Sequence, residues 1–250
     1  MTPSGLMQLD LSTLGLGVAD IVALAWFLLC TVGYNFVTGM RGLWKASLVG
    51  AIQEQRMLWM SHMADRKDRV IDVLLISNLA TGNSFFASTS IVILGALSAV
   101  LGSGEHAQAV LEQLPFVAHA SPIAWDIKII VLMLVIIYAF FKFAWAFRLA
   151  HYSMIMMGAT PSVDSAPIAA REDQAARAGR VAGIAAEHSN LGLRAYNFGL
   201  AAIGWFFHPV GFILTTTLVV LIVTRREFFS RTLSILTDHQ TRTISTLPPR

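Results

Sequence analysis

Three long stretches of the chain contain no charged residue, and a fourth contains only one. Residues 21–40, 73–104 and 195–224 hold no Asp, Glu, Lys or Arg, and residues 129–147 hold only Lys142. A helix needs about 20 mainly apolar residues to cross the hydrocarbon core of a bilayer. We therefore predict an all-α integral membrane bundle of about four transmembrane helices, with amphipathic helices on the cytoplasmic side.

The composition agrees with a membrane protein. Charged residues make up 13% of the chain, whereas a soluble domain has about 25%. The length of 250 residues fits a single membrane domain, residues 1–250, and leaves no room for a separate soluble catalytic domain. The net positive charge comes from Lys and Arg clustered beside the spans, so the expected partner is the lipid bilayer and not nucleic acid. The lone Cys30 excludes an internal disulfide and a thiolate-only metal site within one chain.

The charge pattern divides the chain into spans and connections. The expected spans cover residues 14–39, 70–101, 125–147 and 195–223. The expected connections are an amphipathic helix over residues 41–69, a turn-rich linker over 158–167, an Ala-rich surface helix over 168–187 and a C-terminal tail over 225–250. In the amphipathic segment, apolar residues recur at helical spacing, which suits a helix lying in the headgroup region.

Basic residues predict the orientation of the chain. Residues 41–69 contain six Lys and Arg, whereas residues 102–124 contain none. By the positive-inside rule the first segment is cytoplasmic, which puts the N-terminus outside. Four crossings would leave the C-terminus outside as well, although Arg225, Arg226 and Arg231 follow the last span. Either this charge bias is overruled, or the break at His208-Pro209 makes the fourth span a re-entrant hairpin, and the sequence leaves both open.

The second span is unusually polar. Its polar side chains fall on two faces at 100° per residue: Asn78, Thr81, Ser84 and Ser88 on one arc, and Asp72, Asn83 and Ser90 on another. Intramembrane polar groups are costly unless they have partners, so at least one face packs on protein or lines a cavity. We predict that the first arc, together with His208 of the fourth span, lines a pathway for a small solute or an ion.

Two further patterns concern the ends and the interior of the spans. Arg69 and Asp72 lie three residues apart at the start of the second span, where they can pair on one helical face as a gate or as a headgroup anchor. In the fourth span, small and polar residues fall near one line of the helical wheel: Asn197, Ala201, Gly204, His208, Gly211 and Thr215. Such a line allows another helix to approach closely in lipid.

Methionine and histidine gather at the expected cytoplasmic boundary. The candidate ligands are Met57, Met60, His62 and Met63 after the first span, and His151 and Met154 after the third. Thioether and imidazole groups suit copper(I), and a pair of histidines such as His62 and His151 can ligate a haem. The competing interpretation, which we prefer, is that the methionines fill gaps in the packing and that no cofactor is bound.

Three stretches of the sequence resemble one family. These are RKDRVIDVLLISNLATGNSFFASTSIVILGALSAVL, HSNLGLRAYNFGLAAIGWFFHP and RREFFS, and they are similar to a group of bacterial proteins with relatives in plants, known as domain of unknown function number 599. The resemblance extends from about Val22 to Thr232. It implies a multi-pass membrane protein of about four helices, expected in the bacterial inner membrane, and it implies no reaction or substrate.

The sequence carries no motif of a common enzyme class. A Gly-rich phosphate loop, HExxH and GxSxG are absent, so we expect a protein that is not an enzyme. Three functions stay open. The preferred one is a bundle that forms or assists a small-solute or ion pathway. The others are a haem- or copper-binding subunit of a membrane redox system, and an assembly or scaffolding partner of a membrane complex, in either case with a homo-oligomer or a larger complex possible.

Overall fold

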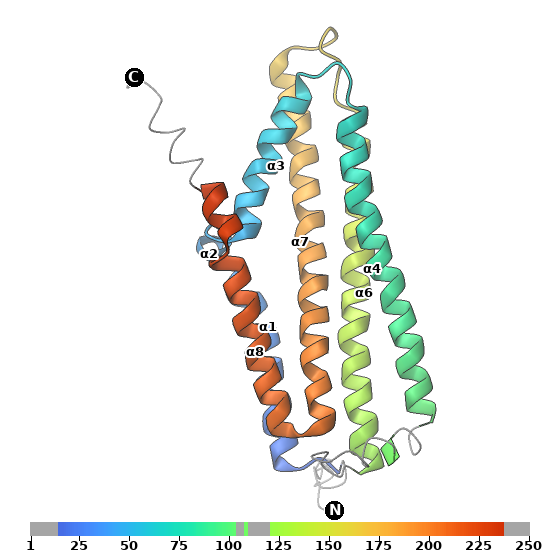
Figure 1. Ribbon diagram of the computed structural model, residues 1–250. Helices are drawn as coiled ribbons and strands as arrows, with labels where there is room; N and C mark the ends of the chain where they lie inside the picture. Colours follow the sequence, from blue (N-terminus) through green and yellow to red (C-terminus); the bar gives the residue numbers. More distant parts are fainter. Residues whose placement is uncertain (1–14, 104–107, 110–120, 238–250) are drawn as a thin grey trace, which may run out of the picture.

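The computed structural model describes residues 15–103, 108–109 and 121–237, and these residues are almost entirely helical (Figure 1). The helices are α1 (Val18–Thr38), α2 (Arg41–Lys45), α3 (Leu48–Ala64), α4 (Val70–Gly102), α6 (Pro122–Gly158), α7 (Ile168–Phe207) and α8 (Pro209–Phe228). No strand occurs in the described part of the chain. The prediction of an all-α fold is confirmed.

Three long helices form the centre of the molecule. α4, α6 and α7 contain 33, 37 and 40 residues, which corresponds to about 50–60 Å each at 1.5 Å per residue. They lie side by side, with α6 packed against both of the others (Figure 1). α1 and α8 flank the lower half of α7, and α3 flanks its upper half (Figure 1).

Four segments are long and apolar enough to cross a membrane: α1, α4, α6 and Pro209–Thr237. This confirms a bundle of about four membrane-spanning helices. The expected span over residues 70–101 matches α4 closely, and the expected linker over 158–167 separates α6 from α7. α6 is longer than the expected span at both ends. Its first turn begins at Pro122, and the Ser121 hydroxyl caps it by accepting the Ala124 N–H at 3.1 Å.

The prediction of one continuous span over residues 195–223 is wrong, whereas the break predicted at His208-Pro209 is confirmed. α7 ends at Phe207, α8 begins at Pro209, and His208 between them has an extended backbone with φ −161° and ψ 144°. Proline has no N–H for the ladder and clashes with the preceding turn, and here the chain reverses direction so that α8 returns alongside α7 (Figure 1). The expected surface helix over 168–187 is also wrong as a separate element, because it is the first half of α7.

The small residues predicted on one line of a single helix instead face each other across the α7–α8 hairpin. A Cβ added to Gly204 would lie 2.6 Å from the Thr215 hydroxyl oxygen, and one added to Gly211 would lie 3.3 Å from the Gly204 carbonyl oxygen. The Thr215 hydroxyl donates to the Ala201 carbonyl at 2.8 Å. Small residues permit close backbone approach between membrane helices. Here they permit it between α7 and α8, and not between one continuous helix and a partner.

The amphipathic segment over residues 41–69 is not one continuous helix. It divides into α2 and α3, and Ser47 caps α3 by accepting the Gly50 N–H at 3.3 Å. α3 then runs along the upper half of α7 (Figure 1). Met60 and Met63 of α3 are fully buried in a core cluster with the Ala-rich face of α7, because alanine and glycine on that face let the two helices approach closely.

Candidate functional site

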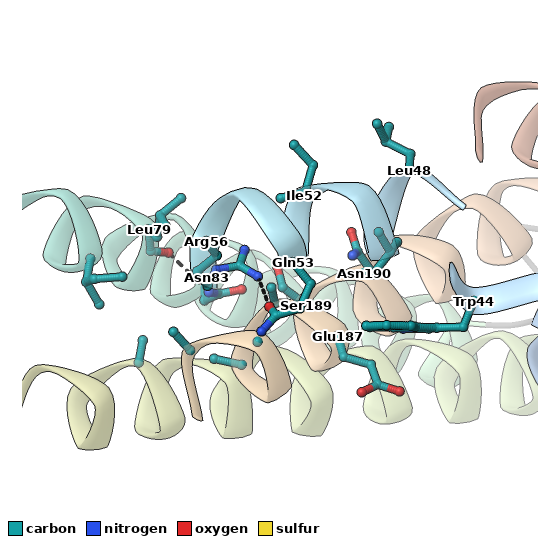
Figure 2. A pocket seen from close by; sticks show the side chains of 17 residues that line it. Trp44, Leu48, Ile52, Gln53, Arg56, Leu79, Asn83, Glu187, Ser189 and Asn190 are labelled. Atoms are coloured by element: carbon teal, nitrogen blue, oxygen red, sulfur yellow. Dashed lines mark hydrogen bonds between the residues drawn. The ribbon is translucent and has the colours of Figure 1, made fainter. Parts of the chain in front are cut away.

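A cavity of about 280 Å³ lies where α2 and α3 face α4 and α7 (Figure 2). Its walls are of two kinds. Apolar side chains come mainly from Trp44, Leu48, Ile52, Ile76 and Leu79, and polar ones come from Gln53, Arg56, Asn83, Glu187, Ser189 and Asn190. The volume is close to the lower end of the range of about 300–1,000 Å³ that small-molecule sites occupy. The site is thus concave and amphipathic.

Glycines of α7 position the polar side of the cavity. Gln53 and Arg56 lie three residues apart on α3 and therefore share one face. A Cβ added to Gly183 would lie 2.4 Å from the Gln53 Oε1 atom, so only a glycine leaves room for this side chain in its present position. The Gln53 amide donates to the Gly179 carbonyl at 3.3 Å. The packing of α3 on α7 thereby fixes Gln53, which in turn holds Arg56.

Arg56 is a cation without an anionic partner in the described part of the chain. Its guanidinium donates to the Gln53 Oε1 atom at 2.5 Å, and none of the ion pairs among the described residues includes it. Burial lowers the pKa of the Arg56 guanidinium from its ordinary value. Arginine nevertheless stays protonated in proteins, so the cavity wall carries a positive charge.

Asn83 of α4 lines the same cavity and carries a buried acceptor. The residue is 7% exposed, and its amide nitrogen donates to the Leu79 carbonyl at 3.1 Å. This bond fixes which way the amide points, since the opposite orientation would set two oxygens against each other. The Oδ1 atom has no hydrogen-bond partner among the described residues and is covered by its neighbours. An unpartnered buried acceptor is uncommon in proteins, and this one belongs to a residue of the cavity lining.

The predicted pathway residues do not meet in one place within the chain. Asn78, Thr81 and Ser88 lie exposed on the outer side of α4, and Ser84 is only half-buried. The Thr81 hydroxyl donates to the carbonyl of Ser77 in its own helix at 3.0 Å, which satisfies it without a neighbouring helix. The buried polar face is the other one, since Asp72, Asn83 and Ser90 all point into the bundle. The first arc stays a prediction for a surface between chains, not for a channel inside one.

His208 lies apart from that arc, at the α7–α8 turn. Its side chain is exposed, and its Nδ1 atom accepts the Val210 N–H at 3.1 Å. It therefore caps the first turn of α8.

Arg69 and Asp72 do not form the predicted pair. Asp72 is fully buried and accepts from the Trp59 indole at 2.6 Å and from Arg66 at 2.5 Å. Arg69 turns to the α6–α7 linker, where its guanidinium donates to the Thr160 carbonyl at 2.5 Å and to the Pro161 carbonyl at 2.8 Å. Asp72 and Arg69 each bind other, closer partners instead of one another, and their hydrogen bonds stabilise the α3–α4 turn.

The candidate metal ligands are separated by the packing. Met60 and Met63 are fully buried, and Met57 and Met154 are partly buried. The imidazoles of His62 and His151 are exposed, and the His151 Nδ1 atom lies 2.9 Å from the Phe147 carbonyl oxygen. The described residues contain no cluster of three His, Cys, Asp or Glu side chains that could hold a metal ion. Met60 and Met157 do share a core cluster, so the two methionine segments meet as packing groups while the histidines stay outside.

Two buried ionic clusters were not indicated by the sequence pattern. In the first, Arg194 of α7 donates to Glu227 of α8 at 2.5 Å and to the Thr38 hydroxyl of α1 at 2.9 Å. In the second, the Lys128 ammonium lies 3.7 Å from an Asp20 carboxylate oxygen and donates to the Trp205 carbonyl at 3.1 Å. The partners lie far apart in the sequence, and charges at the ends of spans gave no signal of their pairing.

Comparison with known proteins gives a family without an activity. The model of a family described as "Protein of unknown function, DUF599" matches residues 22–232. No curated protein and no solved structure matches the chain significantly.

Proposed function

The chain belongs to the DUF599 family of proteins of unknown function, and we propose that it is a non-enzymatic membrane protein that takes up an amphiphilic small molecule in the cavity between α3, α4 and α7. The observation that carries this proposal is the mixed lining of that cavity, in which apolar side chains such as Ile52 and Leu79 lie one helical turn from the polar groups of Arg56 and Asn83. A ligand with one apolar part and one polar part fits such a lining, because each part then meets groups of its own kind.

The position of the cavity along the helices supports the proposal. Trp44 follows α1 directly and lines the cavity, and tryptophan is enriched where a membrane meets water. The cavity therefore corresponds to the headgroup level, just beyond the apolar part of α1. A lipid-like molecule can reach this level from the bilayer without passing through water.

We further propose that the cavity lies on the cytoplasmic side. α1, α4, α6 and α8 are long and apolar enough to span, and the second half of α7 runs beside α1 and α8 at the same level (Figure 1). If α7 also crosses, α1 begins and α8 ends on opposite sides of the membrane. Arg225, Arg226 and Arg231 then share one side with the basic α3 region, which agrees with the positive-inside rule.

The other functions that the sequence left open have less support. A solute or ion pathway through one chain would need polar groups facing inward, and the arc of Asn78, Thr81 and Ser88 faces outward. A redox subunit would need histidine and methionine ligands to converge, and His62 is exposed while Met60 is buried. An assembly role is an outcome of the experiment below, since a copurifying protein in place of a small molecule would indicate it.

The test is whether the cavity holds a small molecule. The protein is purified in mild detergent, and bound small molecules are identified by native mass spectrometry and by extraction. Ala186→Phe adds a ring to the cavity wall, and we expect it to reduce bound amphiphile at least about tenfold, equivalent to about 1.4 kcal/mol.

Ile184→Phe is the matched control, because Ile184 lies on the same helix but is 45% exposed and outside the cavity. It should leave binding unchanged. Equal binding by Ala186→Phe and the unaltered protein would contradict the proposal.

A further inference from the structure

We propose that the cavity selects the headgroup of an anionic phospholipid that also carries a hydroxyl group, with Arg56 binding the phosphate and the Asn83 Oδ1 atom accepting the hydroxyl. This inference rests on the proposed function, since it assigns a ligand class to the same cavity. Two observations carry it independently: a partly buried cation that lacks an anionic partner, and a buried acceptor that lacks a donor, both among the described residues.

The charge of the ligand follows from Arg56. The bond to Gln53 engages one of the five N–H donors of the guanidinium, and the others have no carboxylate partner among the described residues. A partly buried charge without a counter-ion loses part of its hydration without compensation. A phosphate matches the guanidinium fork in shape and in charge, and such charge-assisted hydrogen bonds are stronger than neutral ones. Glu187 also lines the cavity, but it is exposed and forms no ion pair with Arg56.

The hydroxyl follows from Asn83. An anion alone cannot satisfy the Asn83 Oδ1 atom, because this oxygen accepts hydrogen bonds and a phosphodiester has no hydrogen to donate. A ligand that satisfies both groups therefore carries a donor close to its phosphate. A glycerol headgroup has this arrangement, whereas an alkyl phosphodiester has the same charge without the donor.

The apolar side chains of the cavity indicate that the ligand also has an apolar part. Leu48, Ile52 and Leu79 line the cavity and are partly or largely exposed (Figure 2). Acyl chains can lie along these side chains while the headgroup reaches Arg56. A free polyol phosphate shares the headgroup chemistry but has nothing to place against this wall.

The experiment measures competition between defined lipids. The full-length protein in nanodiscs or mixed micelles receives phosphatidylglycerol, phosphatidylethanol or phosphatidylcholine, and native mass spectrometry measures the bound fraction of each. We expect phosphatidylglycerol to bind at least about tenfold more tightly than phosphatidylcholine. Arg56→Gln should remove this preference for an anion. The control Arg180→Gln changes the same charge at an exposed position of α7 outside the cavity and should preserve it.

Asn83→Leu tests the hydroxyl. The unaltered protein should prefer phosphatidylglycerol to phosphatidylethanol, which is anionic but has no headgroup hydroxyl, and Asn83→Leu should equalise the two while keeping the preference for anions. Addition of glycerol 3-phosphate identifies the source of the headgroup. Displacement of the lipid at millimolar concentration would assign the site to the free polyol phosphate, and failure to displace it would assign the site to the lipid.

The inference is overturned if Arg56→Gln binds anionic and neutral lipids in the same ratio as the unaltered protein. If Ala186→Phe still abolishes lipid binding in that case, the cavity is an amphiphile site and only the anionic headgroup is wrong. If neither substitution changes binding, the proposed function fails with it.

Discussion

Removing the negative charge of Glu227 should destabilise the bundle strongly. Arg194 and Glu227 are each 8% exposed, and the guanidinium donates to Glu227, Asn35 and Thr38. The other carboxylate oxygen of Glu227 accepts the Tyr34 hydroxyl at 2.8 Å. Loss of one partner from a buried pair costs about 3–5 kcal/mol, because the remaining charge is left uncompensated.

For Glu227→Gln we expect a loss of about 3 kcal/mol, at the lower end of that range. Asn35 and Thr38 continue to accept hydrogen bonds from Arg194, and the glutamine carbonyl can still accept from Tyr34. The loss corresponds to roughly a 150-fold change in the unfolding equilibrium. Reversible unfolding by sodium dodecyl sulfate in mixed micelles, followed by tryptophan fluorescence, measures it.

Two further variants, measured in the same assay, test the physical reason for this loss of stability. The double variant Arg194→Met with Glu227→Met leaves no buried charge, so it should be clearly more stable than Glu227→Gln alone. Asp173→Asn breaks the Arg177–Asp173 pair, in which both side chains are 55% exposed, and it should cost no more than about 0.5 kcal/mol. The reasoning is refuted if Glu227→Gln costs as little as Asp173→Asn, or if the double variant is the least stable of the three.

Three other predictions follow from the packing and the topology. Gly192→Ala should destabilise the protein in the same unfolding assay by about 1–3 kcal/mol, since its Cβ would lie 2.7 Å from the buried Phe143 ring. Gly82→Ala is the control, because its Cβ meets open space, and it should be neutral or stabilising. Equal effects of the two substitutions would contradict the argument. Asp72→Leu should cost about 1–3 kcal/mol and change the Trp59 emission, because it removes the acceptor of the indole N–H; an unchanged spectrum and stability would refute the burial of this bond. The third prediction uses single cysteines in a Cys30→Ser background and an impermeant thiol reagent. Cysteines that replace Leu58 and Ser234 should be labelled from one side of the membrane, and a cysteine that replaces Ser103 from the other. Labelling of all three from one side would exclude the proposed orientation.

The parts of the fold that depend on local signals could be predicted from the sequence. The second span was expected over residues 70–101 and is α4, Val70–Gly102, because hydropathy and the flanking charges mark both of its ends. The linker over 158–167 is rich in Gly, Pro and Ser, and those residues end helices wherever they cluster. The α7–α8 hairpin could be predicted only as one of two alternatives, from the break at His208-Pro209. A reversal at His208 leaves the apolar run unbroken, so hydropathy does not distinguish two antiparallel helices from one kinked helix.

The cavity residues could be found only in part. The sequence indicated a second polar face on α4, and Asn83 belongs to it, but the choice of inward face depended on which helices pack there. A hydroxyl group misled the prediction, because the Thr81 hydroxyl donates to a carbonyl of its own helix and needs no neighbouring helix. Arg56 fell outside the apolar stripe of its segment, which is typical of a solvated residue. Its partner Gln53 is positioned by Gly179 and Gly183, more than 120 residues away, and a sequence pattern does not show that contact.

The two buried ionic clusters mark the two ends of the apolar layer. Asp20 with Lys128 lies at the end where α1 begins, and Arg194 with Glu227 lies where α1 ends. Asp20 and Asn35 are separated by about 22 Å along α1 at 1.5 Å per residue, a little less than the bilayer core of about 30 Å. Charges at these two levels reach the headgroup regions, so each cluster ties helices together without standing at the bilayer centre. α3 and the upper parts of α4, α6 and α7 extend beyond the end of α1 (Figure 1), so the headgroup level proposed for the cavity agrees with the position of the Arg194–Glu227 cluster at that end of α1.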